Sequence, residues 1–251
     1  MTELIDYKKV FKNKEVTENE EVFEIEVFKK NNSSTYKVED FTQSQSHGLF
    51  WDSEIREVVF GLDACKNDTK KYDIYCSENK FNQEENISIK TSSNNNIDCG
   101  DILRFFNGDF TKKYTIILIR YSQIGLLKKI KEIIEIDYNV ELKNYLFGTI
   151  TEEELNNYVK IIKNIPNGEA NYEIKENYKQ IKQSLQKQHN MKINISPKVD
   201  SKSQRRVQCS ITKVDKILEL FPQNVISRTT EPIIREIKIT STINSGPRQF
   251  K

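Results

Sequence analysis

The chain has 251 residues, of which 30% are charged and 36% hydrophobic, and its net charge is +2. This length and composition are typical of one large globular domain with a substantial core. The most apolar stretch, Tyr114–Tyr121, has only the length of a strand, so no membrane span is expected. The first segment, MTELIDYKKVFKNK, lacks the apolar centre of a signal peptide, which favours a cytoplasmic location.

The cysteine and histidine content argues against a zinc site. The four cysteines include no C-x-x-C pair, and the chain has only two histidines. Structural zinc sites usually draw their four ligands from such pairs. We therefore expect the cysteines to be reduced.

Charge is distributed unevenly along the chain. Residues 187–251 contain 13 Lys and Arg against 5 Asp and Glu, a net charge of +8, so residues 1–186 carry −6. Contacts between cations and phosphates supply the sequence-independent part of nucleic-acid affinity. The last quarter is therefore the candidate surface for a polyanion, and the alternative is an ordinary solvated surface.

The first half of the chain predicts alternating helices and strands. Alternation of apolar and polar residues in Glu21–Lys29 and the turn before Thr35–Val38 indicate a hairpin, and helical spacing of apolar residues indicates a helix over Gly48–Leu62. The elements expected next are strands at Tyr72–Cys76 and Asn86–Thr91, a short helix at Asp101–Phe106 and a strand at Tyr114–Ser122. This order is typical of an α/β fold with a mixed central β-sheet flanked by helices.

The second half predicts helices followed by a basic, strand-rich region. A capping box opens the helix expected at Thr151–Asn164. The other elements expected are helices at Ile124–Ile136 and Glu169–His189, a strand at Met191–Ile195, a loop at Ser196–Gln204, a strand at Arg205–Ile211, a helix at Val214–Phe221 and a strand-rich tail from Val225.

Asp73 and Lys90 form the main candidate for a catalytic site. Alternate side chains of a strand share a face, so Ser88 and Lys90 are expected to point the same way. If the Asp73 strand pairs with this one, the carboxylate and the ammonium converge at one sheet edge. We expect Mg²⁺ there on Asp73 and on the backbone carbonyl of Ile89, with Lys90 stabilising a phosphate or a bound water. Glu54 on the preceding helix could complete the anionic cluster, and the alternative is a structural ion pair.

Glu54, Asp73 and the triplet Ser88-Ile89-Lys90, placed in the order helix, strand, strand, helix, strand, resemble the PD-(D/E)XK nucleases, and among them the type II restriction endonucleases. The resemblance covers residues 48–122. It implies that Asp73 binds Mg²⁺, that Lys90 assists the attacking water and that Glu54 is a supporting acid and metal ligand. Ser88 stands where the family has an acid, which shifts that role to Glu54 or Glu84.

The stretch Ser196–Ser210 has the composition of a DNA-reading element. Arginine addresses guanine, glutamine pairs with adenine, and serine and lysine hold bases or phosphates. Arg205 and Arg206 are expected to point to opposite faces of their strand. The predicted DNA contacts are Lys198, Ser201, Lys202, Ser203, Gln204, Arg205, Arg206 and Gln208.

The sequence is therefore interpreted as a Mg²⁺-dependent endonuclease that cuts double-stranded DNA at a specific sequence and acts as a homodimer. The expected regions are an N-terminal hairpin region (1–47), a nuclease core (48–125), a helical region (126–190), and a basic DNA-recognition region (191–251). The helix at Ile124–Ile136 is the candidate dimer face. Two alternatives stay open: a structure-specific repair or replication nuclease of the same fold, and a DNA-binding protein without catalysis.

Overall fold

The computed structural model describes residues 46–64, 70–166, 172–199 and 205–245, with side chains from Phe50 onward. The chain divides into two units, Met1–Ser34 and Thr35–Lys251, and every described residue belongs to the second. The hairpin expected at Glu21–Val38 lies outside the described residues.

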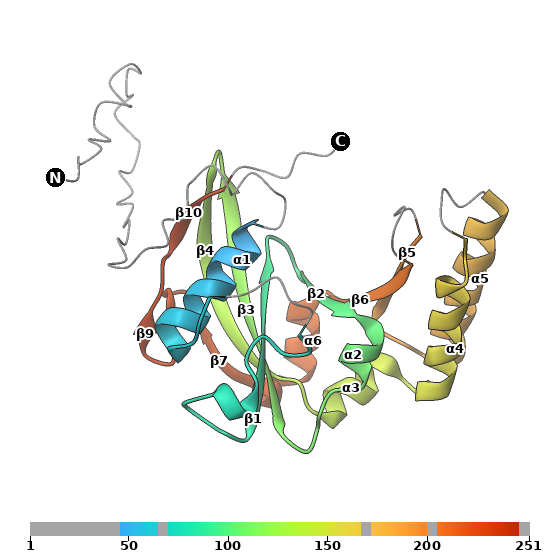
Figure 1. Ribbon diagram of the computed structural model, residues 1–251, viewed down its shortest axis with the longest axis horizontal. Helices are drawn as coiled ribbons and strands as arrows, with labels where there is room; N and C mark the ends of the chain where they lie inside the picture. The colour runs from blue at the N-terminus through green and yellow to red at the C-terminus, as the bar shows by residue number, and fades with distance from the viewer. Residues whose placement is uncertain (1–45, 65–69, 167–171, 200–204, 246–251) are drawn as a thin grey trace. The chain divides into compact units, whose positions relative to one another are not determined.

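The centre of this unit is a mixed five-stranded sheet (Figure 1). Its strands follow the order β1-β3-β4-β10, and β7 also pairs with β4. Only β1 and β3 run parallel; β4 is antiparallel to β3, β7 and β10. The strands are β1 (Glu85–Ser92), β3 (Lys113–Ile124), β4 (Leu127–Asp137), β7 (Val225–Thr229) and β10 (Thr242–Asn244).

The parallel pair β1–β3 needs a crossover connection, because parallel neighbours cannot be joined by a tight turn. The crossover contains strand β2 (Asn96–Asp101) and the short helix α2 (Ile102–Phe106). The Asp101 side chain begins α2 by accepting bonds from the backbone N–H groups of Leu103 and Arg104. In the resulting register Lys90 lies beside Leu118 in the middle of β3.

A second, three-stranded antiparallel sheet has the order β2-β6-β5, with β5 at Asn194–Lys198 and β6 at Arg206–Thr212. A third consists of the two-residue strands β8 (Ile233–Ile234) and β9 (Ile237–Lys238). The remaining helical elements are α1 (Ser46–Glu54), which continues as a π-helical segment (Ile55–Phe60), α3 (Val140–Phe147), α4 (Glu152–Lys163), α5 (Tyr172–Gln188), α6 (Val214–Leu220) and two 3₁₀ turns (Cys76–Glu78 and Pro222–Asn224).

Two buried clusters cover the two faces of the five-stranded sheet. Ile117 and Ile119 of β3 pack in one cluster with Trp51 and Ile55 of the first helix. Their neighbours in the strand, including Leu118, belong to the other cluster, which also contains residues of α2, α3 and α4. The alternation of β3 side chains between two apolar layers explains why this strand is apolar almost throughout. The expectation of a mixed sheet flanked by helices is confirmed.

The prediction of a helix at Ile124–Ile136 is wrong, because the segment is mostly a strand. Ile124 ends β3, Gly125 turns the chain with a φ of +57°, and the rest forms strand β4. The register slips between Arg120 and Tyr121 of β3, so that Lys131 has no partner in the ladder. This bulge breaks the two-residue alternation, and the apolar spacing of β4 then imitates a helix. A dimer face on such a helix loses its basis, and the expected helical region (126–190) begins with a central strand.

Other expected elements are confirmed to within a few residues, among them β1, β3, β5, β6, α2, α4, α5 and α6. The strand expected at Tyr72–Cys76 is reduced to a single antiparallel bridge between Ile74 and Ile87, after which the chain enters a 3₁₀ turn. Within the described residues, no helix has both the length and the apolar character needed to cross a membrane.

Candidate active site at the edge of the central sheet

Asp73 and Lys90 meet at the open edge of β1. Oδ2 of Asp73 accepts a hydrogen bond from Nζ of Lys90 at 3.2 Å and another from the backbone N–H of Ile89 at 2.6 Å. The side chains of Lys90 and Asp73 are 26% and 27% exposed. The structure therefore brings these two predicted site residues together as an ion pair that solvent, and hence a ligand, can reach.

Backbone pairing holds Asp73 in this position. The N–H groups of Asp73 and Ile74 both donate to the carbonyl of Ile87 at 3.0 Å, and the N–H of Ile87 returns a bond to Ile74 at 2.8 Å. Two residues farther along β1, the backbone N–H of Ile89 points to the same open edge, and there the Asp73 carboxylate accepts its hydrogen bond. The N–H and C=O of one strand residue point to the same side. The carbonyl of Ile89 therefore faces the same edge as the Asp73 carboxylate.

The surroundings keep Lys90 charged. Burial alone would lower the pKa of the Lys90 ammonium, but the charge of Asp73 and its hydrogen bond raise it, and Cys99 and Asp52 add smaller contributions. The net effect is a pKa above the ordinary lysine value. Lys90 is thus a fixed cation near neutral pH rather than a group that accepts a proton.

Ser88 faces the aromatic side of the sheet. It is 3% exposed, and its Oγ lies 3.1 Å from the hydroxyl of Tyr114 on β3. Burial raises the pKa of Tyr114 strongly, so its hydroxyl stays protonated. The ring of Tyr72 packs edge-on against Tyr114, with centroids 5.0 Å apart. The serine at the position of the expected acid is therefore part of a buried hydroxyl pair.

Glu54 faces away from Asp73, toward the C-terminal segment. Its Oε1 accepts hydrogen bonds from the backbone N–H and the hydroxyl of Thr240, at 2.9 and 2.6 Å. Trp51, one turn earlier, donates from Nε1 to the carbonyl of the same residue at 3.1 Å. Burial raises the pKa of Glu54, and the bonds from Thr240 offset this only partly. The structure does not bring Glu54 to the Asp73–Lys90 pair.

The charge of another acidic residue of α1, Asp52, makes a small contribution to the raised pKa of Lys90. Arg56, one turn after Asp52, hydrogen-bonds with its guanidinium to the backbone carbonyl of Asp73. Asp52 lies inside α1, which spans Ser46–Glu54. Asp52 and Arg56 are four residues apart, which places both side chains on one face of the helix.

Glu84, the other alternative acid, lies in the turn immediately before β1, is exposed and pairs with Lys112. Its neighbour Glu85 is buried and pairs with Arg235 at 2.9 Å. Among the described residues, no group of three or more His, Cys, Asp or Glu side chains could hold a metal ion. Asp73 and the Ile89 carbonyl are hard oxygen donors, which fits Mg²⁺ held by one or two carboxylates, waters and a substrate phosphate.

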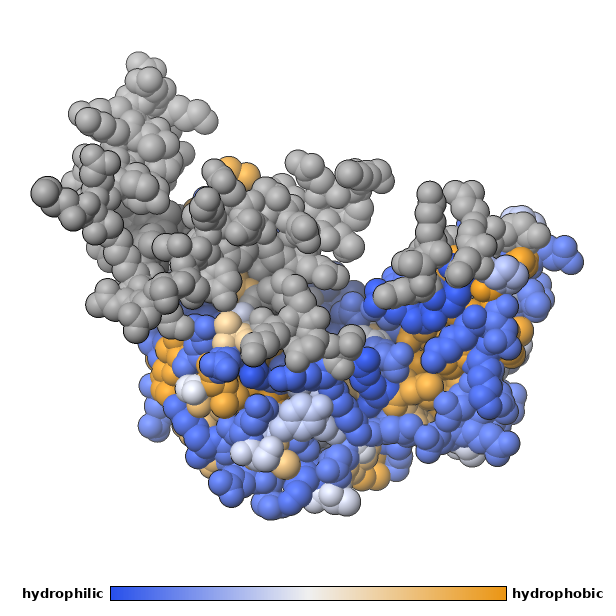
Figure 2. Space-filling model, in the orientation of Figure 1, coloured by the Kyte–Doolittle hydropathy of each residue, from blue (hydrophilic) through white to orange (hydrophobic). Residues whose placement is uncertain are grey.

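The predicted DNA-contact residues are divided by the structure. Lys198 and Arg206 are exposed and lie opposite each other across β5 and β6, and Gln208 lies opposite Ser196 on the same face. Figure 2 shows hydrophilic side chains gathered over these two strands. Arg205 points the other way, as expected, and donates to the carbonyls of Ile165 and Pro166 at 3.3 and 2.5 Å. The remaining four, Ser201, Lys202, Ser203 and Gln204, lie outside the described residues.

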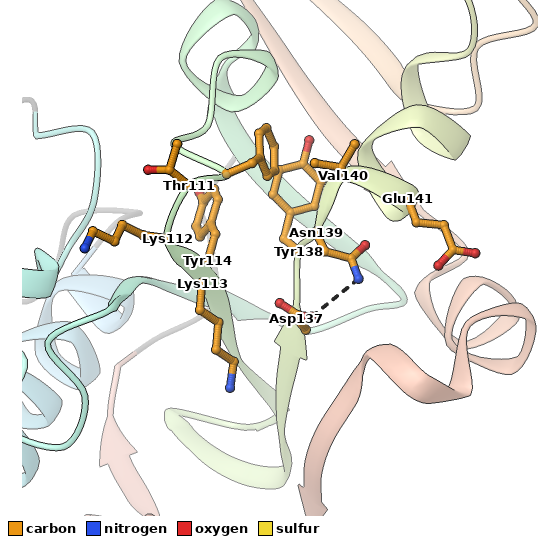
Figure 3. Close-up of a pocket in the computed structure, with 10 residues that line it drawn as sticks. Thr111, Lys112, Lys113, Tyr114, Asp137, Tyr138, Asn139, Val140 and Glu141 are labelled. Atoms are coloured by element: carbon orange, nitrogen blue, oxygen red, sulfur yellow. Dashed lines mark hydrogen bonds between the residues drawn. The ribbon is translucent and has the colours of Figure 1, made fainter.

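A shallow pocket of about 480 Å³ lies where β3 begins and β4 ends (Figure 3). It is lined by Phe110–Tyr114 and Asp137–Glu141 and does not include Asp73 or Lys90. Within it, Asn139 donates to Asp137 at 3.4 Å and also caps α3 through Leu142. These bonds serve the local structure at the end of β4 and the start of α3.

Comparison of the chain with protein-family models, with curated proteins and with solved structures gives no match.

Proposed function

We propose that this chain is a Mg²⁺-dependent endonuclease of the PD-(D/E)XK type that cuts double-stranded DNA at a specific sequence, as a type II restriction enzyme does. The observation that carries the proposal is the carboxylate of Asp73, bonded to both the ammonium of Lys90 and the N–H of Ile89 at a partly exposed sheet edge. The order of α1, the bridge between Ile74 and Ile87, β1, α2 and β3 supports it, because it is the order expected from the resemblance.

The residues of the edge have separate roles in this proposal. Bound Mg²⁺ supplies a Lewis acid and an activated water. Asp73 and the Ile89 carbonyl would hold the ion. Lys90, kept charged by Asp73, stabilises the negative charge that builds on the phosphate oxygens as water attacks. Because its pKa is raised, Lys90 acts through its charge and not as the base.

DNA recognition is assigned to the outward face of the β5–β6 hairpin. A two-stranded ribbon fits the major groove, where glutamine and arginine side chains can read base edges. Lys198 and Arg206 supply charge at the end of the hairpin, and Gln208 and Ser196 supply groups that can bond to bases. A palindromic target is matched by two copies of the chain, so a homodimer is part of the proposal.

Digestion of plasmid and phage DNA tests the function directly. With Mg²⁺ the protein is expected to give discrete fragments whose sequenced ends share one site, and EDTA is expected to stop the reaction. Fragments without a common end sequence, together with cutting of branched DNA, would favour a structure-specific nuclease. DNA binding without any metal-dependent cutting would overturn the enzymatic proposal.

A further inference from the structure

Two cysteines lie on one face of two neighbouring strands in the three-stranded sheet. Strands β2 and β6 run antiparallel and side by side (Figure 1). Ile97 of β2 lies opposite Ile211 of β6 in their ladder. Cys99 and Cys209 each follow two residues farther toward the same end of the ladder. Because alternate side chains of a strand share a face, the two thiols lie on the face of the two isoleucines.

The packing of the two cysteines agrees with this placement. Cys209 is a fully buried member of the larger apolar cluster, 1% exposed, and Cys99 is half-buried and packs against the same cluster. Burial raises the pKa of the Cys209 thiol, and a hydrogen bond with the Cys99 thiol raises it further. Both cysteines are free. The fold therefore brings two reduced thiols into contact.

The ladder brings the two residues within reach of a disulfide bond. Cys99 is the extra residue of a bulge, because Asp98 pairs with Ser210 and Gly100 pairs with Cys209. At a bulge, two residues of one strand lie opposite a single residue of the other. Cα atoms of opposing residues are about 4.5–5.5 Å apart, inside the range of about 4.4–6.8 Å that a disulfide spans. The two sulfurs can therefore be joined without a large movement of the backbone.

The two thiols differ in their access to solvent. Cys209 is enclosed by the cluster, whereas Cys99 is half-buried, with its Sγ 3.6 Å from the carbonyl of Ile97. Gly100, beside Cys99, has a φ of +74° and leaves open space where a side chain would begin. A small reagent from solvent therefore meets Cys99 first. An accessible thiol next to a second, resolving thiol is the arrangement of reversible cysteine oxidation, while a buried thiol alone is inert.

We propose that Cys99 and Cys209 form a site of reversible oxidation, at which a hydroperoxide converts the two thiols into a disulfide between β2 and β6. The sulfur of Cys99, after losing its proton, attacks one oxygen of the hydroperoxide and breaks the O–O bond. The other oxygen takes up the proton and leaves as an alcohol or as water. The sulfur of Cys209 then attacks the sulfenic acid of Cys99, and the hydroxyl group leaves with the Cys209 proton as water. Two thiols are oxidised and one hydroperoxide is reduced.

The disulfide joins two parts of the chain that are 110 residues apart. Strand β2 belongs to the crossover between β1 and β3, and β6 belongs to the hairpin that carries Arg206 and Gln208. Oxidation therefore links the connection that follows Lys90 to the proposed DNA-recognition hairpin by a covalent bond. This inference goes beyond the proposed nuclease activity and does not rest on it, because it depends on the two thiols alone.

The test uses the full chain with Cys65→Ser and Cys76→Ser, so that the pair alone remains. Hydrogen peroxide and tert-butyl hydroperoxide are added in separate titrations, and the products are followed by intact mass and by peptide mapping without reductant. The expected product lacks two hydrogen atoms, links Cys99 to Cys209 within one chain, and returns to the starting mass with dithiothreitol. Cys209→Ala in this background is expected to stop at the sulfenic acid of Cys99, which dimedone traps.

A chain that keeps Cys76 and Cys209 instead is the matched control, because Cys76 is half-buried like Cys99 but precedes β1. It is expected to form no disulfide within one chain. Melting temperatures check that each variant folds, and the mapping of the chain with both Cys99 and Cys209 needs no substitution at either position. Disulfides only between two chains, a sulfinic acid at Cys99 beside a free Cys209, or an equally fast internal disulfide in the control would overturn the proposal.

Discussion

Lys90 is held in its charged form by a partner that is itself a candidate metal ligand. The Asp73 carboxylate raises the pKa of Lys90, and its Oδ2 accepts hydrogen bonds from both the ammonium and the N–H of Ile89. The arrangement fixes the position of both charges before any ligand binds. Preorganised charge is the form in which proteins stabilise a developing phosphorane most effectively.

Removing this charge should affect catalysis far more than binding. Lys90→Met is expected to lower the single-turnover cleavage rate by about 10²–10³-fold, the usual loss when one preorganised group is removed. DNA affinity, measured by fluorescence anisotropy with Ca²⁺ in place of Mg²⁺, should change only slightly. A variant that cleaves at the normal rate would remove Lys90 from the chemistry.

Ser88 permits a second test at the residue scale. Because its hydroxyl is buried against Tyr114, Ser88→Ala should cost roughly 1–3 kcal/mol of unfolding free energy by leaving the tyrosine without a partner. Ser88→Asp should cost more, since it places a carboxylate among buried aromatic rings. Urea titrations of both variants measure the difference. A Ser88→Asp protein as stable as the parent, with stronger metal binding, would show that this position reaches the site.

At the scale of elements, the β5–β6 hairpin separates its side chains by face. Arg205 is bonded to the carbonyls that follow α4, while Arg206 and Lys198 remain exposed on the other face. The composition of Ser196–Ser210 therefore overstates the number of cations that this face can offer to DNA. The exposed face retains both kinds of group that the proposed DNA recognition requires, cations for phosphates and polar uncharged groups for bases.

These kinds of group should respond differently to mutation. Gln208→Ala is expected to weaken binding to the cognate site by roughly 1–3 kcal/mol and to leave binding to random duplex unchanged. Lys198→Ala should weaken both and reduce the dependence of affinity on salt. Binding of cognate and random duplexes at several salt concentrations distinguishes the two cases. Equal losses on both duplexes for Gln208→Ala would leave the hairpin as a non-specific clamp.

At the scale of the whole molecule, arginines of the basic last quarter (residues 187–251) form ion pairs with glutamates of the acidic part of the chain (residues 1–186). Arg228 pairs with Glu132 of β4 at 2.8 Å. Arg235 lies in the turn between β8 and β9, with a φ of +49°, and bonds to Glu85 of β1 and Glu135 of β4 at 2.9 and 3.2 Å. Strands β7 and β10 of the same quarter pair with β4. The last quarter is therefore part of the central sheet as well as the carrier of the proposed DNA contacts.

Arg235→Ala should be strongly destabilising, because it removes the guanidinium that pairs with two buried carboxylates and leaves Glu85 only the longer contact with Lys113 at 3.7 Å. The expected loss is about 3–5 kcal/mol, measured by urea unfolding near neutral pH. Burial alone raises the pKa of Glu85, but the hydrogen bonds of Arg235 and Thr115 outweigh it and lower the pKa below 4.5. In the parent, this stabilisation is present above the unfolded-state pKa and lost as the pH falls through the lower folded-state pKa.

In Arg235→Ala the burial of Glu85 is opposed less strongly, because Lys113, at 3.7 Å, is the cation that still pairs with it, so the folded-state pKa of Glu85 rises. The acid limb of the profile of melting temperature against pH should then move to higher pH than in the parent. Glu85→Gln in the same background should largely remove that shift. An unchanged acid limb in Arg235→Ala would mean that the pair does not govern the stability of the sheet.

Local patterns in the sequence determined most helices and strands and the two residues at the centre of the site. A capping box begins α4, helical spacing predicts α5 and α6, and strand alternation places Ser88 and Lys90 on one face. The pairing of Asp73 with Lys90 also followed from the sequence, because the two segments are close along the chain and joined by a polar turn.

Only the tertiary structure decided the features that depend on residues distant in sequence. Pairing with β3 made β4 a strand, although the bulge in this pairing gives β4 an apolar spacing that also fits a helix. The bonds from Thr240 to Glu54 and from Arg56 to Asp73 determined that Glu54 faces away from the Asp73–Lys90 pair. Glu85 and Glu135 made Arg235 a partly buried partner of the central sheet. In each case the local pattern allowed two outcomes, and burial against a distant partner selected one of them.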